Sequence, residues 1–260
     1  MMSANSVLVL KVGGALLQNE AATLKLMSAI KEMGATGQKI VLVHGGGCLV
    51  DEQLAANDKQ VSKLDGLRVT PSDQIGIVVG ALAGTSNKML QAAATKAGMV
   101  AVGMSLGDGN TVNATIKDPR LGLVGEVTPN DASYLSFILD QGWLPICSSI
   151  AISAAGDMLN VNADQAATAL AKLVNGTLVL LSDVSGVWDA NKQVIKSLNK
   201  HEIETLVAQG VIEKGMKVKV EAALEVAQWM GKPVLVASWQ DTEQLKTLAQ
   251  GGSVGTQIQP

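Results

Sequence analysis

Aromatic side chains are scarce in this sequence, since phenylalanine, tyrosine and tryptophan together make up 2% of its 260 residues. Proteins bind single-stranded nucleic acids largely by stacking bases on aromatic rings, and few such rings are available here. The formal net charge is −3, which offers no positive surface to the phosphates of DNA, RNA or acidic membranes. We therefore expect no nucleic-acid and no membrane partner, and any anion must be bound by a few local groups.

Cysteines and long apolar runs are also few. Cys48 and Cys147 form no Cys-x-x-Cys motif, and each lies in an apolar stretch, which is typical of buried free thiols in a reducing compartment. No apolar run approaches the ~18–20 residues of a membrane-spanning helix. The first residues include no basic region followed by an apolar segment, as a signal peptide would. The sequence predicts a cytoplasmic protein.

Several common catalytic motifs are absent. The chain has no G-x-x-x-x-G-K-[ST], no G-x-G-x-x-G after a strand, and no histidine pair or cysteine cluster with zinc-ligand spacing. His44 and His201 are its two histidines, so a Ser-His-Asp triad is not credible. Glycine turns, separated lysines, an aspartate and an arginine remain. Such a set suits phosphoryl transfer between anions, which depends on positioning and charge neutralisation.

The first strand ends in an unusual way. Four apolar residues, 7–10, are typical of a strand buried on both faces of a parallel sheet, and Lys11, Val12, Gly13 and Gly14 follow. An unpaired cation would be costly to bury, and glycines let the backbone approach a ligand closely. This stretch alone leaves two interpretations open: the strand end delivers Lys11 to an anion, or it forms a tight turn with Lys11 reaching solvent.

A second strand, residues 39–43, runs into His44 and three glycines at 45–47, and a helix follows at 49–56. A glycine run between strand and helix presents backbone N–H groups at the positive end of the helix, which favours phosphate or carboxylate binding over a simple turn. His44 could be a base. A histidine at a strand end more often bonds the neighbouring backbone, and we prefer that interpretation.

Residues 59–69 predict a hairpin with its turn at Asp65-Gly66, and Thr70-Pro71 have the residue types that begin a helix. Arg68 would then precede a helix N-terminus, where it could hold a carboxylate. Without further context, a solvated surface arginine is the simpler interpretation.

Three polar residues precede the alanine-rich helix at 166–174. Helix capping explains Asn162 and Asp164, but it does not explain Asn160 in the extended segment before them. Lys217 and Lys219 lie two residues apart on a later helix and therefore face different directions, so only one of them is expected to serve a site.

The predicted fold is α/β, a three-layer αβα sandwich around a largely parallel open sheet with two lobes. Strands and helices alternate along the chain, and no linker, repeat or low-complexity segment divides it. We expect one domain, 1–260.

Six segments resemble, in order and from the first strand to the end of the chain, those of the amino acid kinase family. The segments around Lys11 and Ser182 are shared widely in that family. Those at 66–70 and 160–164 are more specific, and they resemble members that phosphorylate the γ-carboxylate of N-acetyl-L-glutamate in arginine biosynthesis. The six segments are 11–14, 43–47, 66–70, 160–164, 181–186 and 215–219.

The resemblance implies a role for each of these residues. Lys11 would contact the transferring phosphoryl group and Lys219 the ATP side, while Asp164 would lie between the two lysines and orient them. Gly13, Gly14 and Gly46 would donate N–H groups to the phosphoryl oxygens. N-acetyl-L-glutamate would be held by Gly46, Gly47, Arg68 and Asn160. The residues expected around ATP are Ser182, Asp183, Val184, Ser185, Gly186, Val187, Trp188, Ile212, Gly215, Met216 and Lys217. Mg²⁺ would be carried mainly on the ATP phosphates.

The resemblance also bears on assembly. An N-lobe, 1–159, would bind the acyl substrate and dimerise, and a C-lobe, 160–260, would bind ATP. Arginine-inhibited hexamers of the family have an extra N-terminal helix, for which a first strand starting at about residue 7 leaves no room. We therefore expect a homodimer insensitive to arginine.

Two alternatives stay open: a kinase for aminoadipate, glutamate or aspartate, and a non-catalytic nucleotide or amino-acid sensor on the same fold. A carboxylate nucleophile is already ionised at pH 7, so the lack of an obvious base does not count against a kinase.

Overall fold

The computed structural model describes residues 7–64 and 66–260, so Asp65, expected in a hairpin turn, lies outside the described residues. Within these ranges the main sheet has eight strands in the order β12-β14-β13-β11-β1-β2-β8-β5. Neighbouring strands are parallel except that β14 runs antiparallel to β13. The strands are β1 (Leu8–Val12), β2 (Ile40–His44), β5 (Ala101–Ser105), β8 (Leu144–Ser148), β11 (Thr177–Ser182), β12 (Ser197–Leu198), β13 (Val234–Ser238) and β14 (Thr256–Ile258).

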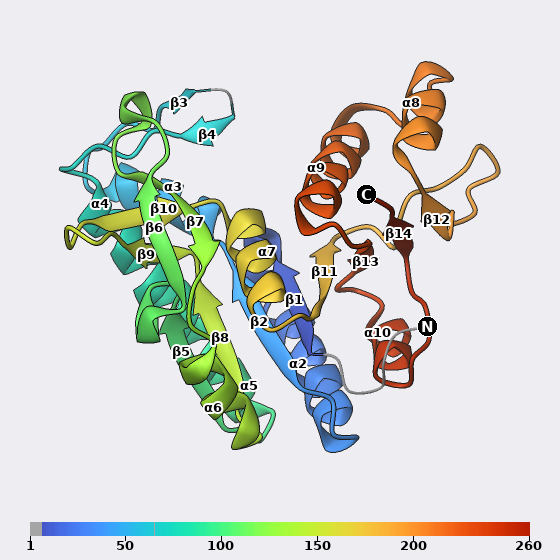
Figure 1. Cartoon of the computed structure of the whole chain (residues 1–260), viewed down its shortest axis with the longest axis horizontal. Coiled ribbons are helices and arrows are strands. Elements are labelled where there is room, and N and C mark those ends of the chain that lie inside the picture. The colour runs from blue at the N-terminus through green and yellow to red at the C-terminus, as the bar shows by residue number, and fades with distance from the viewer. Residues whose placement is uncertain (1–6, 65) are drawn as a thin grey trace.

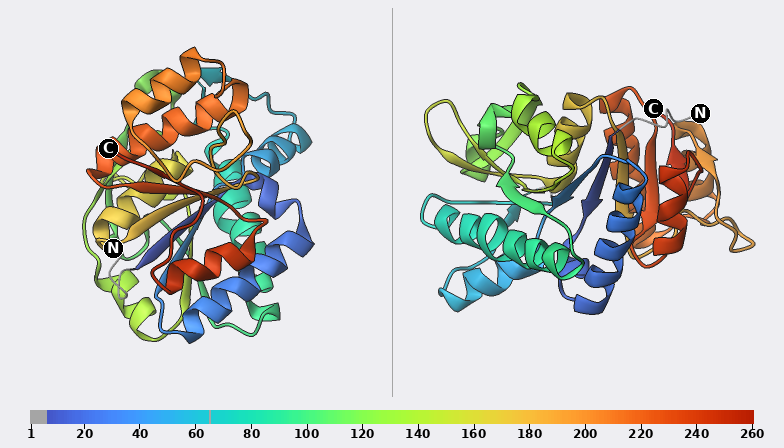
Figure 2. Two further views of the ribbon diagram at one scale, coloured as in Figure 1. Left: turned by 90° about the vertical axis from the view of Figure 1, so that its right-hand side faces the viewer. Right: turned by 90° about the horizontal axis from the view of Figure 1, so that it is seen from below.

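Helices cover both faces of this sheet, which confirms the predicted αβα architecture (Figure 1). One layer contains α2 (Glu20–Ala35), α5 (Asn87–Lys96) and α10 (Thr242–Ala249). The other contains α6 (Ser133–Asp140), α7 (Ala163–Leu173), α8 (Lys200–Ala208) and α9 (Lys214–Met230). Figure 2 shows α8 and α9, in orange, on the opposite face from α2 and α10, in blue and red.

Strand alternation in β1 decides which layer receives Lys11. Leu8, Leu10 and Val12 pack into the core formed with α2, α5 and α10, whereas Val9 packs into the core on the α7 side. Successive side chains of a strand point to opposite faces, so Lys11 lies on the same face as Val9. The central strand therefore directs its one cation toward α7.

In the described part of the chain, two smaller sheets lie at the carboxyl ends of the main-sheet strands that belong to the first half (Figure 1). The hairpin of β3 (Lys63–Leu64) and β4 (Leu67–Arg68) confirms the prediction for residues 59–69. A second antiparallel pair is formed by β6 (Val112–Ile116) and β7 (Val124–Pro129). β10 (Met158–Val161) joins β7 and β9 (Ile150–Ile152). Because β10 spans the proposed lobe boundary at 159/160, the division into lobes stays a prediction.

Thr70-Pro71 do not begin a helix, so that prediction is wrong. The backbone of Thr70 is held by the following loop instead: its N–H donates to Leu121 and its carbonyl accepts from Leu123. The helix α4 (Ile75–Val79) begins after an intervening turn and continues through a π-helical segment, Gly80–Ser86, into α5. Such π segments are frequent at functional sites.

The thiols differ in burial. Cys147 is buried in β8, as expected, and burial raises the pKa of its thiol. Cys48 is exposed, contrary to the prediction, because it lies in the first turn of α3 (Gly47–Ala56), at the open end of the glycine turn. Among the described residues no helix is long and apolar enough to cross a membrane.

The loop that pairs with Thr70 requires a glycine at position 122, and this requirement can be tested. This residue has φ of 70°, and an added Cβ would lie 2.4 Å from the Thr70 carbonyl oxygen. Gly142 has φ of 71° and open space around it. We expect Gly142→Ala to lower the free energy of unfolding by about 1 kcal/mol through backbone strain alone. Gly122→Ala should cost clearly more, because backbone must also move. Urea unfolding of the two variants measures the difference, and equal losses would contradict the packing argument.

Candidate active site

Lys11 has a charged partner rather than an open path to solvent. Its Nζ lies 2.9 Å from Oδ1 of Asp164, and its side chain is 18% exposed. Asp164 is in the first turn of α7, where Asn162 caps the helix by accepting hydrogen bonds from the N–H groups of Asp164 and Gln165. The cap fixes the start of α7 beneath β1, and a carboxylate suits that positive helix end. The structure thus joins two residues that the sequence analysis placed in one site.

The two glycine turns face each other across the ends of β1 and β2. These strands are parallel neighbours, so their carboxyl ends meet at one edge of the sheet. A Cβ on Gly14 would lie 3.6 Å from the Gly47 nitrogen, and one on Gly46 would lie 2.7 Å from the Ser86 hydroxyl. The first N–H groups of α3 have no acceptor within the helix. Together the turns form a narrow cradle suited to an anion beside Lys11.

His44 supports this cradle from the buried side. Its Nδ1 lies 2.8 Å from the Gly45 carbonyl oxygen, and its Nε2 lies 3.1 Å from Nδ2 of Asn87 on α5. Because the Asn87 amide nitrogen can only donate, Nε2 accepts and Nδ1–H donates to Gly45. Burial lowers the pKa of His44 to about 4, so the ring is neutral. The preferred interpretation of His44, a bond to neighbouring backbone, is confirmed.

Arg68 is not a solvated surface residue. Its side chain is 12% exposed, with Nη1 lying 2.5 Å from Oδ1 of Asp51 and Nη2 donating to the Gly47 carbonyl oxygen at 3.3 Å. The β3–β4 hairpin therefore brings the guanidinium to the N-terminus of α3. An arginine in this place can hold a carboxylate next to the glycine cradle.

Asn160 extends this polar group from β10. Its amide nitrogen donates to the Thr70 hydroxyl at 3.1 Å, and Thr70 is buried. Since Thr70 follows Arg68 by two residues, the hairpin and β10 are tied together at their polar ends. Because the Thr70 hydroxyl is buried and accepts this hydrogen bond, the contact holds the Asn160 side chain in one orientation.

A cavity of about 340 Å³ opens beside Lys11 at the carboxyl ends of β1 and β11. The chain continues from these adjacent strands to opposite sides of the sheet, and open α/β sheets bind ligands at such switch points. Lys219 of α9 also lines the cavity and lies 2.5 Å from Oδ1 of Asp183, whose pKa it lowers. Each lysine thus pairs with a different carboxylate, whereas Asp164 was expected to lie between both.

The other residues expected around ATP are spread more widely. Ser182 and Asp183 line the cavity. Val187 and Ile212 are buried, and the Val187 N–H donates to the Thr256 hydroxyl, so these two residues support the site from within the core. The Trp188 ring is exposed, with its Nε1 donating to the Ser185 hydroxyl. Lys217, which the resemblance placed around ATP, lies near Glu221 on the exposed side of α9, and of the two lysines it is Lys219 that lines the cavity. The Val184 N–H bonds Ser182, Gly186 packs against Thr256, Gly215 is in the first turn of α9, and Met216 packs on the core.

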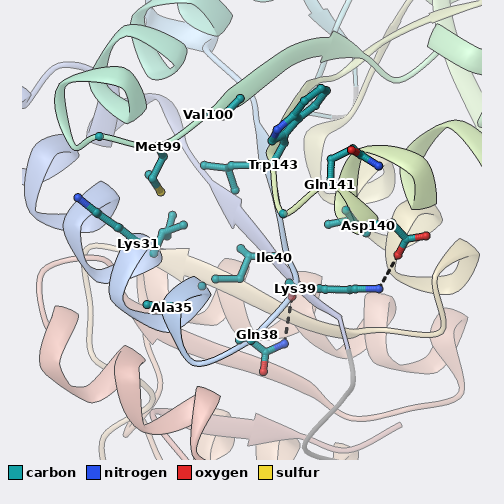
Figure 3. Close-up of a pocket in the computed structure, with 17 residues that line it drawn as sticks. Lys31, Ala35, Gln38, Lys39, Ile40, Met99, Val100, Asp140, Gln141 and Trp143 are labelled. Atoms are coloured by element: carbon teal, nitrogen blue, oxygen red, sulfur yellow. Dashed lines mark hydrogen bonds and ion pairs between the residues drawn. The ribbon is translucent and has the colours of Figure 1, made fainter.

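A larger cavity of about 880 Å³ adjoins this one, since Asp164 and Ala222 line both. It lies between the β6–β7 hairpin and α9, with Leu67 of β4 on its wall. A separate hollow occurs at the opposite edge of the sheet, where the strands begin (Figure 3). It contains the ion pair of Lys39 with Asp140, and none of the proposed site residues lines it.

Sequence reasoning missed the groups that hold these residues in place. Asp51 and Asn87 lie inside helices, and no motif marks them. Asp51 lies beyond the first turn of α3, where a carboxylate gains little from the helix dipole, so no local signal points to it. Thr70 was assigned a capping role that it does not have. Their partners come from distant segments, which a pattern within one segment does not reveal.

The chain is similar to known proteins over its whole length. The pattern that defines the amino acid kinase family matches residues 6–238. An acetylglutamate kinase of Shewanella denitrificans is 81% identical over 255 residues, 98% of each chain. The solved structure of smu.665 from Streptococcus mutans has a TM-score of 0.77 at 30% identity, covering 97% of this chain and 98% of that one. An N-acetylglutamate synthase of Neisseria gonorrhoeae shares the fold, with a TM-score of 0.78 at 23% identity over 98% of this chain and 59% of its own.

The neutral, buried His44 predicts a loss of stability in acid. The unfolded chain binds a proton near pH 6.5 and the folded chain only near pH 4, so folding is disfavoured as the pH falls between these values. The expected slope approaches about 1.4 kcal/mol per pH unit. Urea unfolding between pH 7 and pH 4.5 measures it. His44→Gln should lose this component while His201→Gln, at an exposed histidine, keeps it. Equal slopes in all three proteins would contradict the assignment.

Proposed function

The chain belongs to the amino acid kinase family, and we propose that it transfers the γ-phosphoryl group of ATP to the γ-carboxylate of N-acetyl-L-glutamate. The product is N-acetyl-γ-glutamyl phosphate, in the second step of arginine biosynthesis. The observation that carries the proposal is one cavity lined by Lys11, Lys219 and the glycines 13 and 14 at the switch point of the sheet. The name of the 81% identical relative supports the choice of substrate.

Charge neutralisation is the main contribution of these residues to the reaction. A γ-carboxylate oxygen attacks the γ-phosphorus, and the bond from that phosphorus to the bridging oxygen breaks, so ADP leaves with the electron pair. The equatorial phosphoryl oxygens carry the developing charge. Lys11 meets that charge from the acceptor side and Lys219 from the ATP side, while the N–H groups of the glycine turns donate to the same oxygens. Asp164 orients Lys11 through their ion pair.

No general base is needed, because the attacking carboxylate is ionised at pH 7. His44 is accordingly not needed as a base: its ring is buried, and both of its nitrogens already form hydrogen bonds within the protein. Mg²⁺ supplies further neutralisation when it enters with ATP. Asp164 and Asp183 are paired with lysines, and in the part of the chain that the structure describes no three acidic, histidine or cysteine side chains are grouped to hold a metal. These facts favour a metal carried on the nucleotide phosphates.

The acyl substrate fits the polar groups at the N-terminus of α3. Its γ-carboxylate would enter the cradle at Gly46 and Gly47, and Arg68 would hold the α-carboxylate. Asn160 offers an amide to the N-acetyl group. Arg68 lies against the Gly47 carbonyl, which supports one substrate spanning both points.

A homodimer is part of the proposal. β5 is an edge strand of the sheet, and large apolar side chains are exposed near it: Val100, Phe137 and Trp143. Figure 3 shows Val100 and Trp143 beside the same hollow. A second copy covering this edge would remove apolar surface from water. A monomer on size-exclusion chromatography would overturn this part. The free thiols favour the cytoplasm as the location.

The activity is tested by incubating the protein and ATP with N-acetylglutamate, glutamate, aspartate and aminoadipate in parallel. Hydroxylamine traps any acyl phosphate as a coloured hydroxamate complex with iron. Product with N-acetylglutamate alone is the expected result. Product with another acid alone would show that this acid is the substrate instead. No product from any of the four acids would favour a non-catalytic sensor.

Removal of either lysine should damage turnover more than folding. We expect Lys11→Ala and Lys219→Ala each to lower kcat by at least about 100-fold, as for lost partners of transition-state charge. Lys96→Ala is a matched control, because Lys96 pairs with Glu20 on the exposed helix surface. Steady-state rates and thermal unfolding of all three variants are the measurements. Near-normal rates in the two site variants would refute the mechanism.

A further inference from the structure

The carboxylate that holds Arg68 is itself part of the substrate site. We infer that Asp51 is a positioning residue that aims the Arg68 guanidinium at the α-carboxylate of the acyl substrate, an inference that rests on the proposed function. No sequence motif marks Asp51, and it belongs to α3 rather than to the hairpin that carries Arg68.

The two atoms that join Asp51 to Arg68 are isolated from solvent. Oδ1 of Asp51 and Nη1 of Arg68 are both shielded from solvent, and among the described residues neither makes an aligned hydrogen bond. They lie 2.5 Å apart, so each charge is compensated by the other. A buried cation without this partner would be costly. The Asp51 carboxylate therefore helps to hold the guanidinium beside α3.

Two contacts from one helix face fix the plane of the guanidinium. Nη1 meets Asp51, and Nη2 donates to the carbonyl of Gly47, one helical turn earlier. Residues four apart lie on the same face of a helix, so α3 grips both ends of the planar group. Because Nη1 is shielded from solvent, a ligand can meet the guanidinium only through Nη2 and Nε. They are held next to the glycine cradle before any substrate arrives.

The opposing effect is smaller. Asp51 is an anion near a site for an anionic substrate, and its repulsion of the α-carboxylate would weaken binding. Its side chain is 47% exposed, however, so its second oxygen faces solvent and that repulsion is screened. Its attraction for Nη1 acts across a short, buried contact. Orientation of the guanidinium is therefore the dominant contribution.

The central test compares two substrates on the same protein preparation. The second substrate, 4-acetamidobutanoate, is N-acetylglutamate without its α-carboxylate. In the unmodified protein, the loss of that carboxylate should lower kcat/KM strongly. In Asp51→Asn, the KM for N-acetylglutamate should rise about tenfold, since ordering of the arginine must then be repaid on binding. The kcat value and the KM for ATP should change little.

The ratio of the two kcat/KM values separates positioning from general structural support. If Asp51 aims Arg68, the ratio shrinks severalfold in Asp51→Asn, because only the substrate with an α-carboxylate uses that arginine. If Asp51 merely stabilises the fold, both values fall together and the ratio is unchanged, which would overturn the inference. When turnover of 4-acetamidobutanoate is below detection, its competitive inhibition constant replaces kcat/KM in the ratio.

Asp73→Asn is the matched control, because Asp73 pairs with Lys59 at 2.8 Å near the same hairpin but on the exposed surface. It should leave the ratio unchanged. Asp51→Glu keeps the charge one methylene farther out and should recover part of the lost affinity. If the unmodified protein itself does not phosphorylate N-acetylglutamate, the proposed function fails. Normal activity in the unmodified protein with an unaltered ratio in Asp51→Asn would instead overturn the role of Asp51 alone.

Discussion

The structure depends on the neutralisation of one lysine in a buried central strand. Lys11 extends from β1 on the face covered by α7, and Asp164 in the first turn of that helix compensates its charge at 2.9 Å. Desolvation would otherwise make such a cation costly. The contact joins the first strand to a helix from the second half of the chain. It also leaves an oriented ammonium group at the end of the sheet.

The parallel sheet concentrates positive groups in a chain whose net charge is −3. Parallel strands bring their carboxyl ends to one edge, so the glycine turns after β1 and β2 meet there, together with the polar end of β11. Lys11 and Lys219 line one cavity at this edge. Asp164 and Asp183 line the same cavity, each paired with one of these lysines, so the side-chain charges at this edge balance. An anion is therefore attracted by the oriented ammonium groups and the backbone N–H groups of the glycine turns rather than by an excess of positive charge.

Hydrogen bonds and an ion pair outside the cradle hold its two glycine turns in place. His44 and Asn87 join β2 to α5 beneath the glycine turn, and Asp51 joins α3 to Arg68 above it. Catalysis by positioning requires that the reacting groups be held close to the productive geometry. Residues that hold those groups in place therefore contribute even though they touch no substrate. The same logic explains why Gly46 has no room for a side chain: the Ser86 hydroxyl and Leu82 already fill the space.

The sequence by itself determined the alternation of strands and helices, the glycine turns at strand ends, the cap at Asn162 and the need of Lys11 for a partner. These follow from periodicity, backbone freedom and desolvation, all of which act within a short segment. Only the tertiary structure decided which distant groups meet. It pairs Lys219 with Asp183, Arg68 with Asp51 and His44 with Asn87. It also moves the helix start from Thr70 to Ile75, because the Thr70 backbone pairs with the loop at Gly122. Contacts between remote segments depend on how the layers pack, and local pattern does not encode that choice.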